Sequence, residues 1–94
     1  MSERTAPSLA KLDDLLAALN SLPAGSTKDE LVETAEALRR AVAAFHMEAI
    51  RFRMHSVDRW LKAAGDDIRC RRLFDELRVE LENAGFQTRS HSAP

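Results

Sequence analysis

Four residues spaced by sevens, Arg39, His46, Arg53 and Trp60, form the clearest chemical pattern in the sequence. On a helix, this spacing places side chains on one face. If two copies pack antiparallel, His46 meets its own copy at a two-fold axis, between arginines that bind carboxylates or an anionic ligand. In the alternative, which we favour, the arginine stems cover apolar surface at an amphipathic boundary and His46 is merely hydrogen-bonded. Both interpretations place these residues at an interface.

Metal and nucleophilic chemistry have weaker support. His55 and Asp58 lie three residues apart, but a specific metal site usually takes three or four ligands, so we expect no metal and no cofactor. Cys70 falls within an apolar stripe and is expected to be buried, although the arginines beside it would lower the pKa of an exposed thiol. No spacing suggests a nucleophile, a base and an orienting group together, so we expect a protein that is not an enzyme.

Basic residues concentrate between Arg51 and Arg72, where seven Lys or Arg oppose three Asp. The corner at Gly65 has the form of a helix-turn-helix, with Arg69, Arg71 and Arg72 at the start of the second helix, where phosphates or bases are contacted. Against this, carboxylates precede these arginines and the whole chain has a formal net charge of −1. A small DNA-binding transcriptional regulator is therefore an alternative hypothesis, and a ligand- or metal-sensing helical bundle is another.

Apolar periodicity predicts an all-α fold with three helices, short, long and medium, at about residues 9–21, 28–64 and 67–84. The long helix contains no proline and would form a rod of roughly 55 Å. Short connections favour antiparallel packing of the two flanking helices on this rod.

Local signals mark the predicted helix ends. Leu22 precedes Pro23 and so ends the first helix, and the sequence from Thr27 to Glu30 matches a capping box at the start of the second. Gly65 ends the long helix and Asp66 is expected to cap the next one. The last helix should end in a Schellman motif, with Gly85 in a left-handed conformation and Phe86 against Leu81.

The long helix carries two apolar stripes rotated by roughly a quarter turn. The first stripe comprises Leu31, Ala35, Leu38, Val42, Phe45, Ala49 and Phe52, and the second comprises Met47, Ile50, Met54, Val57, Leu61 and Ala64. Two stripes imply two sets of neighbours, and the flanking helices leave the middle uncovered. A second copy of the chain would cover it, giving a dimeric helical bundle with coiled-coil-like pairing.

The 94 residues have room for one domain, expected at residues 8–86, with disordered ends at 1–7 and 87–94. One cysteine and the lack of a secretory pattern favour the cytoplasm, and no apolar run is long enough for a membrane span. The leading hypothesis is a non-enzymatic protein-protein interaction module, acting as a homodimer and serving as adaptor, regulator or chaperone for an unidentified protein partner. The predicted interface residues are Phe45, His46, Ala49, Phe52, Arg53, Met54, Val57 and Trp60.

Overall fold

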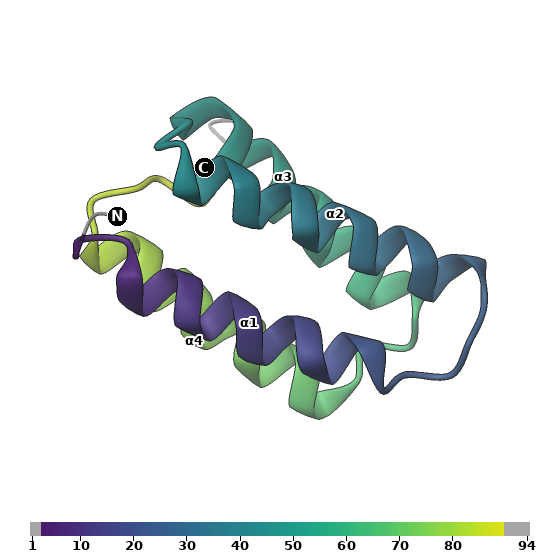
Figure 1. The fold of residues 1–94 in the computed structure, drawn as a ribbon. Coiled ribbons are helices and arrows are strands. Elements are labelled where there is room, and N and C mark those ends of the chain that lie inside the picture. The colour runs from purple at the N-terminus through teal and green to yellow at the C-terminus, as the bar shows by residue number, and fades with distance from the viewer. Residues whose placement is uncertain (1–2, 90–94) are drawn as a thin grey trace.

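The computed structural model describes residues 3–89 and shows four helices in that range: α1 (Ala6–Asn20), α2 (Ser26–Ala43), α3 (Met47–Ala63) and α4 (Ile68–Asn83) (Figure 1). The all-α prediction is confirmed, and the described residues contain no strand. The prediction of three helices is wrong, because the expected helix 28–64 is two helices, α2 and α3.

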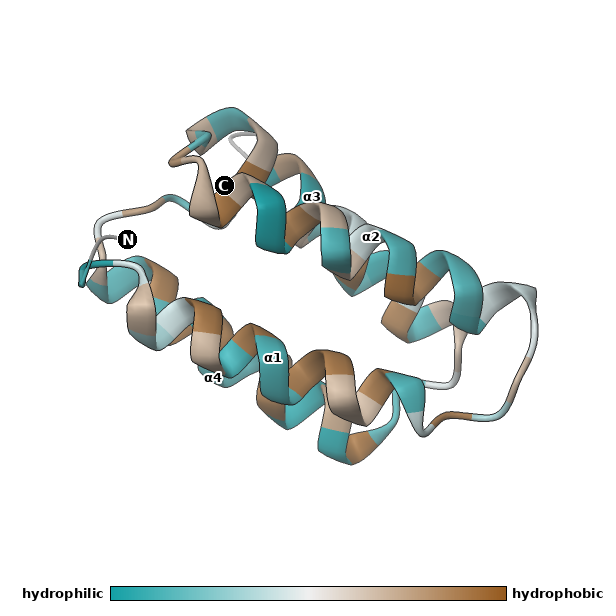
Figure 2. Ribbon diagram, viewed as in Figure 1, coloured by the Kyte–Doolittle hydropathy of each residue, from teal (hydrophilic) through white to brown (hydrophobic). Residues whose placement is uncertain are grey.

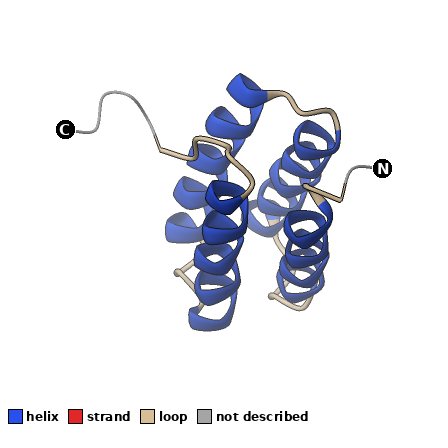
Figure 3. Cartoon of the chain, turned by 90° about the vertical axis from the view of Figure 1, so that its left-hand side faces the viewer, coloured by secondary structure: helices blue, strands red, loops and turns tan. Residues whose placement is uncertain are grey.

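The helices alternate in direction and form two antiparallel pairs, α1 with α4 and α2 with α3 (Figures 1 and 3). α1 also packs on α2, so the first and second helices join the two pairs. The flanking helices therefore do not each lie on half of a long rod, as the sequence suggested. Instead the chain closes into a bundle of 33 × 32 × 19 Å, much shorter than the roughly 55 Å of the predicted rod.

Each helix contributes one apolar stripe to a shared core, and Figure 2 shows hydrophobic segments on the facing sides of the two helix pairs. The stripes recur at three- and four-residue steps, as expected for helices buried on one face. The fully buried side chains include Leu12, Leu15 and Leu19 from α1, Leu31, Leu38 and Val42 from α2, Ile50, Met54 and Leu61 from α3, and Phe74, Leu77 and Leu81 from α4.

The break between α2 and α3 is a Schellman turn made without glycine. Phe45 has a φ of 57°, in the left-handed region that L-residues rarely adopt. Its N–H donates to the Val42 carbonyl at 3.1 Å, and the His46 N–H donates to the Ala41 carbonyl at 2.9 Å. These bonds satisfy the last carbonyls of α2 and reverse the chain within three residues.

The two glycine-ended helices follow the predicted pattern. Gly65 and Gly85 have φ values of 98° and 94°, and the Phe86 N–H donates to the Leu81 carbonyl at 2.9 Å, as a Schellman motif requires. The cap of α4 lies one residue later than expected, since the side chain of Asp67 accepts from the Cys70 N–H at 3.0 Å.

The predicted capping box at the start of α2 does not form. The helix begins at Ser26, one residue before Thr27, and its N-cap is Gly25, which has no side chain to accept a hydrogen bond.

Parts of the predicted disordered ends make defined contacts. Thr5 and Thr88 are only 1% and 4% exposed, and the Arg4 Nε donates to the carbonyl of Ala84 at 2.5 Å. Phe86 is buried beside Phe45, with ring centroids 6.0 Å apart. The segment after α4 therefore closes the end of the bundle at the α2–α3 turn. Residues 1–2 and 90–94 of the predicted ends lie outside the described residues.

Across residues 3–89, every helix is too short or too polar to span a lipid bilayer.

Candidate functional site

A surface depression runs between α2 and α3, and we call it the α2–α3 groove. Because the two helices are antiparallel and joined by the tight turn at Phe45, the start of α2 lies beside the end of α3. The groove is lined by Glu30, Glu33, Thr34, Ala37 and Arg40 from α2 and by Arg53, Ser56 and Trp60 from α3. A second, adjoining depression on α3 shares Ser56 and Trp60 and adds Arg59 and Ala63.

Charge is segregated along the α2–α3 groove. Glu30 and Glu33 lie near the start of α2, whereas Arg40 lies roughly 15 Å further along that helix. Arg53 of α3, eight residues past the turn, lies between Arg40 and the glutamates and adds to the positive half of the groove, which is the half nearer the turn. None of these four side chains forms an ion pair with another residue in the range 3–89. The groove thus has a negative end and a positive end, both open to an external partner.

Two aromatic residues flank these charges. The Phe52 side chain is 59% exposed, and the Arg53 guanidinium lies 5.1 Å from the centre of its ring. Phe52 precedes Ser56 by one helical turn, so it continues the outward face of α3 that borders the groove. Trp60 is partly buried against the core while its remaining surface lines the groove. Exposed aromatic side chains next to arginine are typical of protein-binding surfaces.

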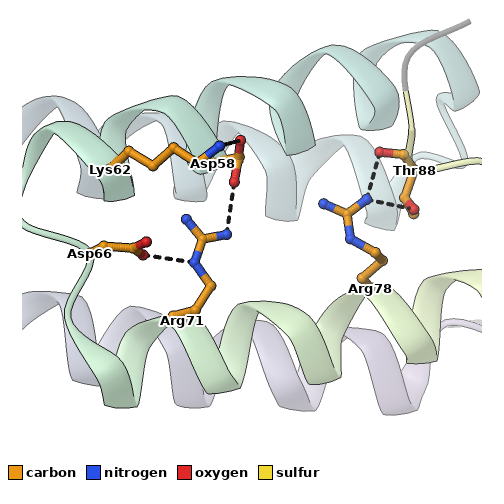
Figure 4. Close-up of polar contacts among 6 residues, drawn as sticks. All are labelled: Asp58, Lys62, Asp66, Arg71, Arg78 and Thr88. Atoms are coloured by element: carbon orange, nitrogen blue, oxygen red, sulfur yellow. Dashed lines mark hydrogen bonds and ion pairs between the residues drawn. The ribbon is translucent and has the colours of Figure 1, made fainter. Parts of the chain in front are cut away.

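The opposite side of α3, which faces α4, has its charges paired within the chain (Figure 4). The Arg71 guanidinium donates through Nε to Asp66 at 2.7 Å and through Nη1 to Asp58 at 2.8 Å. Lys62 approaches the other oxygen of Asp58 at 3.2 Å. Burial acts to raise the pKa of the Asp58 carboxyl, but the hydrogen bonds from Arg71 and Lys62 outweigh it and hold that pKa below its ordinary value. These contacts tie α3 to α4.

A second arginine on α4 holds the segment that follows the helix. Arg78 Nη1 donates to the carbonyl of Thr88 at 3.0 Å and to its hydroxyl at 2.9 Å (Figure 4). The Thr88 hydroxyl in turn donates to Glu82 at 2.8 Å. Both Arg71 and Arg78 lie over the ring of Phe74, at 5.4 and 5.3 Å from its centroid. Burial lowers the pKa of Arg78 from its ordinary value, and the nearby Arg89 adds to this shift.

The structure separates the four residues that the sequence places on one line. Arg39 leaves the line and binds Asp13 of α1, with Nε 2.8 Å from Oδ1. That bond lowers the pKa of the Asp13 carboxyl. His46 is the exposed N-cap residue of α3, with no side-chain capping bond. Arg53 and Trp60 remain together, in the α2–α3 groove.

The predicted interface residues fall into three groups. Phe52, Arg53 and Trp60 lie on or beside the groove. Phe45 and His46 lie in the turn, and Ala49 is partly buried against the core. Met54 and Val57 are fully buried between this chain's own helices, so their apolar side chains belong to the core and offer no surface to a partner.

The arginines proposed for nucleic-acid contact are also divided. Arg69 and Arg72 are exposed, whereas Arg71 is engaged by the two aspartates described above. The closely packed helix pairs are α2 with α3, α1 with α4 and α1 with α2, so α3 and α4 do not pack on each other as the two helices of a helix-turn-helix do.

Cys70 is buried, and burial raises the pKa of its thiol to about 11, so it is a packing residue. Within residues 3–89, no three His, Cys, Asp or Glu side chains converge as metal ligands.

The sequence reading missed the α2 side of the groove. Glu30, Glu33 and Arg40 appear in the sequence as ordinary solvent-exposed charges of an amphipathic helix. One signal was present: every acidic residue of α2 precedes its two arginines, Arg39 and Arg40. This separation of charge indicates a binding surface only once the fold places α3 beside α2 and forms the groove.

No family model matches this chain, and no curated protein or solved structure matches it either. Inference about its function therefore depends on the geometry of the groove and of the turn.

Proposed function

We propose that this protein is a non-enzymatic helical protein-protein interaction module that acts as a homodimer, and that two copies meet through their α2–α3 grooves. The observation that carries this proposal is the segregation of unpaired charge along the groove, with Glu30 and Glu33 at one end and Arg40 and Arg53 at the other. The single free cysteine supports a reducing, cytoplasmic setting.

The charge pattern of the groove is self-complementary. Consider a two-fold axis that lies in the interface and crosses the middle of the groove at a right angle. Rotation about this axis turns the two grooves face to face and reverses one of them, so the glutamate end of each copy meets the arginine end of the other. Isologous dimers require this kind of self-complementary surface. A partner with one sign of charge would satisfy only half of the groove.

The aromatic residues supply the apolar part of the proposed contact. Phe52 is the most exposed aromatic side chain described, and burying it against a second copy removes apolar surface from water. Trp60, already held against the core, presents a rigid surface that loses little side-chain entropy on binding. The charges then select the partner and its orientation, while the aromatic residues contribute most of the affinity.

Charge reversal at each end of the groove tests the proposal. One variant carries Arg40→Glu and Arg53→Glu, and the other carries Glu30→Lys and Glu33→Lys. Each alone would bring like charges together at both contacts of a homodimer, so its dimer should be weaker by at least about a hundredfold. Mixed in equal amounts, the two variants are complementary at both contacts and should form a heterodimer with close to the parent affinity.

Sedimentation equilibrium measures these masses, and circular dichroism checks that each variant is folded. The matched control reverses two exposed arginines at the α3–α4 corner, Arg69→Glu and Arg72→Glu, and should dimerise like the parent. If the parent is a monomer at micromolar concentration, or if both groove variants alone still form dimers in which each chain keeps its own α2–α3 hairpin closed, the proposal is wrong.

A further inference from the structure

The turn between α2 and α3 is built from a sequence that favours continuing the helix. From Ser26 to Ala64 the chain contains neither glycine nor proline, and the turn itself is Ala44, Phe45 and His46. Glycine occupies the left-handed position at the ends of α3 and α4, but Phe45 occupies it here, with a φ of 57°. A phenylalanine disfavours this conformation, whereas alanines on its N-terminal side favour a helix. Local preference and the observed turn therefore conflict.

If Phe45 adopts helical dihedrals, α2 and α3 become one helix from about residue 26 to residue 63. The α3–α4 half, whose two helices are joined by the ion pair of Asp58 with Arg71, then moves away from the α1–α2 half. Every close helix pairing that this breaks, α1 with α4 and α2 with α3, can form again with the corresponding half of a second copy. We propose that the α2–α3 turn is a hinge at which two copies of this chain exchange their α3–α4 halves.

The exposed residues around the turn support a second copy at this place. Phe45 and Met47 are 43% and 41% exposed, although both are large and apolar. In the exchanged dimer the two straightened helices run antiparallel and cross near His46, so the turn residues of both copies come together at the two-fold axis. Apolar side chains that face water in the closed chain would be covered there.

Exchange is independent of the groove dimer, because it depends on the backbone at Phe45 and leaves the groove exposed. An exchanged dimer contains two grooves, each formed by α2 of one copy and α3 of the other. Exchange would therefore turn a module with one groove into a particle with two, able to link further copies.

Two substitutions at one position provide the test. Phe45→Gly removes the left-handed penalty and lowers helix propensity, whereas Phe45→Ala retains the penalty and raises helix propensity. Both lose the ring that contacts Phe86, so they differ only in backbone preference. Each is placed in the Arg40→Glu, Arg53→Glu background, which suppresses the groove dimer, and is refolded from urea at high protein concentration. We expect each straightened hinge to be on the order of a hundredfold less favoured for glycine than for alanine, and the exchanged dimer contains two such hinges.

A distance within one chain identifies the exchanged form. Spin labels are attached at Asp29→Cys and Ala64→Cys in a chain that also carries Cys70→Ala, and an excess of unlabelled chain is added. In the closed hairpin the two labels lie near each other. In a straight helix they are separated by roughly 52 Å. Labelled dimer showing the long distance supports exchange. The exchange proposal is overturned if the dimer shows only the short distance, or if the Phe45→Ala variant forms only monomer. In the parent chain the same labels distinguish a groove dimer from an exchanged dimer, because a groove dimer keeps the α2–α3 hairpin closed.

Discussion

The two sides of α3 use the same kinds of residue in opposite ways. On the side toward α4, Asp58 forms one ion pair with Lys62 of the same helix and another with Arg71 of α4. The second ion pair holds α3 and α4 together. Toward the α2–α3 groove, Arg53 has no ion pair in the described chain, and Phe52 beside it faces water. Charges that are already paired serve stability, whereas unpaired charges beside an exposed ring are available for recognition.

The largest effect on stability is expected at Asp58. Asp58→Ala leaves the Arg71 guanidinium, whose side chain is 23% exposed, without one of its two acceptors. Losing a charged hydrogen bond at a partly buried site should lower the free energy of unfolding by about 2 kcal/mol. Urea denaturation measures this change. Glu33→Ala in the groove, as control, should change it by less than about 0.5 kcal/mol. Equal effects at both positions would remove the distinction between the two sides.

A smaller effect should appear in the dependence of stability on pH. The folded pKa of Asp58 lies below its unfolded value of about 3.9, so its contribution is present above that pH and is lost as pH falls toward the folded pKa. Asp58→Asn should therefore show a shallower loss of stability than the parent between about pH 5 and pH 2. Thermal melts across this range provide the comparison. An identical acid profile would mean that the carboxyl is not held by Arg71.

The ion pair between Lys11 of α1 and Glu76 of α4 tests whether solvent exposure, and not pairing alone, decides how much an ion pair contributes to stability. Their atoms lie 3.0 Å apart, but the Glu76 side chain is 47% exposed. Lys11→Ala should reduce the free energy of unfolding far less than Asp58→Ala does, and added salt should remove most of that difference. A loss as large as that for Asp58→Ala would show that burial is not the deciding factor.

The smallest effect on monomer stability is expected at Phe52. Its ring is mostly exposed, so Phe52→Ala should leave the melting temperature of the monomer unchanged within about 2 °C. The same change should weaken dimerisation, because it removes the exposed ring of the proposed contact. A large fall in melting temperature at a concentration where the protein is monomeric would place Phe52 in the core.

Sequence patterns predicted the helical class and the helix ends that glycine marks, because Gly65 and Gly85 can adopt the left-handed conformation without steric cost. They did not predict the end at Phe45, where no local residue preference opposes a helix. The quarter-turn offset between the two apolar stripes reflects two helices, each with its own core-facing side, and not one helix with two neighbours.

The candidate site was predicted only on its α3 side. Phe52, Arg53 and Trp60 stand out because aromatic and arginine residues are enriched at protein interfaces. Met54 and Val57 were assigned to an interface because the sequence cannot tell which apolar stripe the chain itself covers. The glutamates of α2 gain their role only through the antiparallel hairpin, a tertiary feature that the predicted long helix excluded.

Trp60 provides the most direct test, because it is the only tryptophan and it lines the α2–α3 groove. Mass by sedimentation and tryptophan emission should be followed together as the parent protein is diluted from high to low micromolar concentration. If two copies meet through the groove, the mass should fall from twice the chain mass to the chain mass. The Trp60 emission should shift to longer wavelength with the same midpoint, as water reaches the ring. A fall in mass with no change in emission, or a monomer at every concentration, would contradict the account.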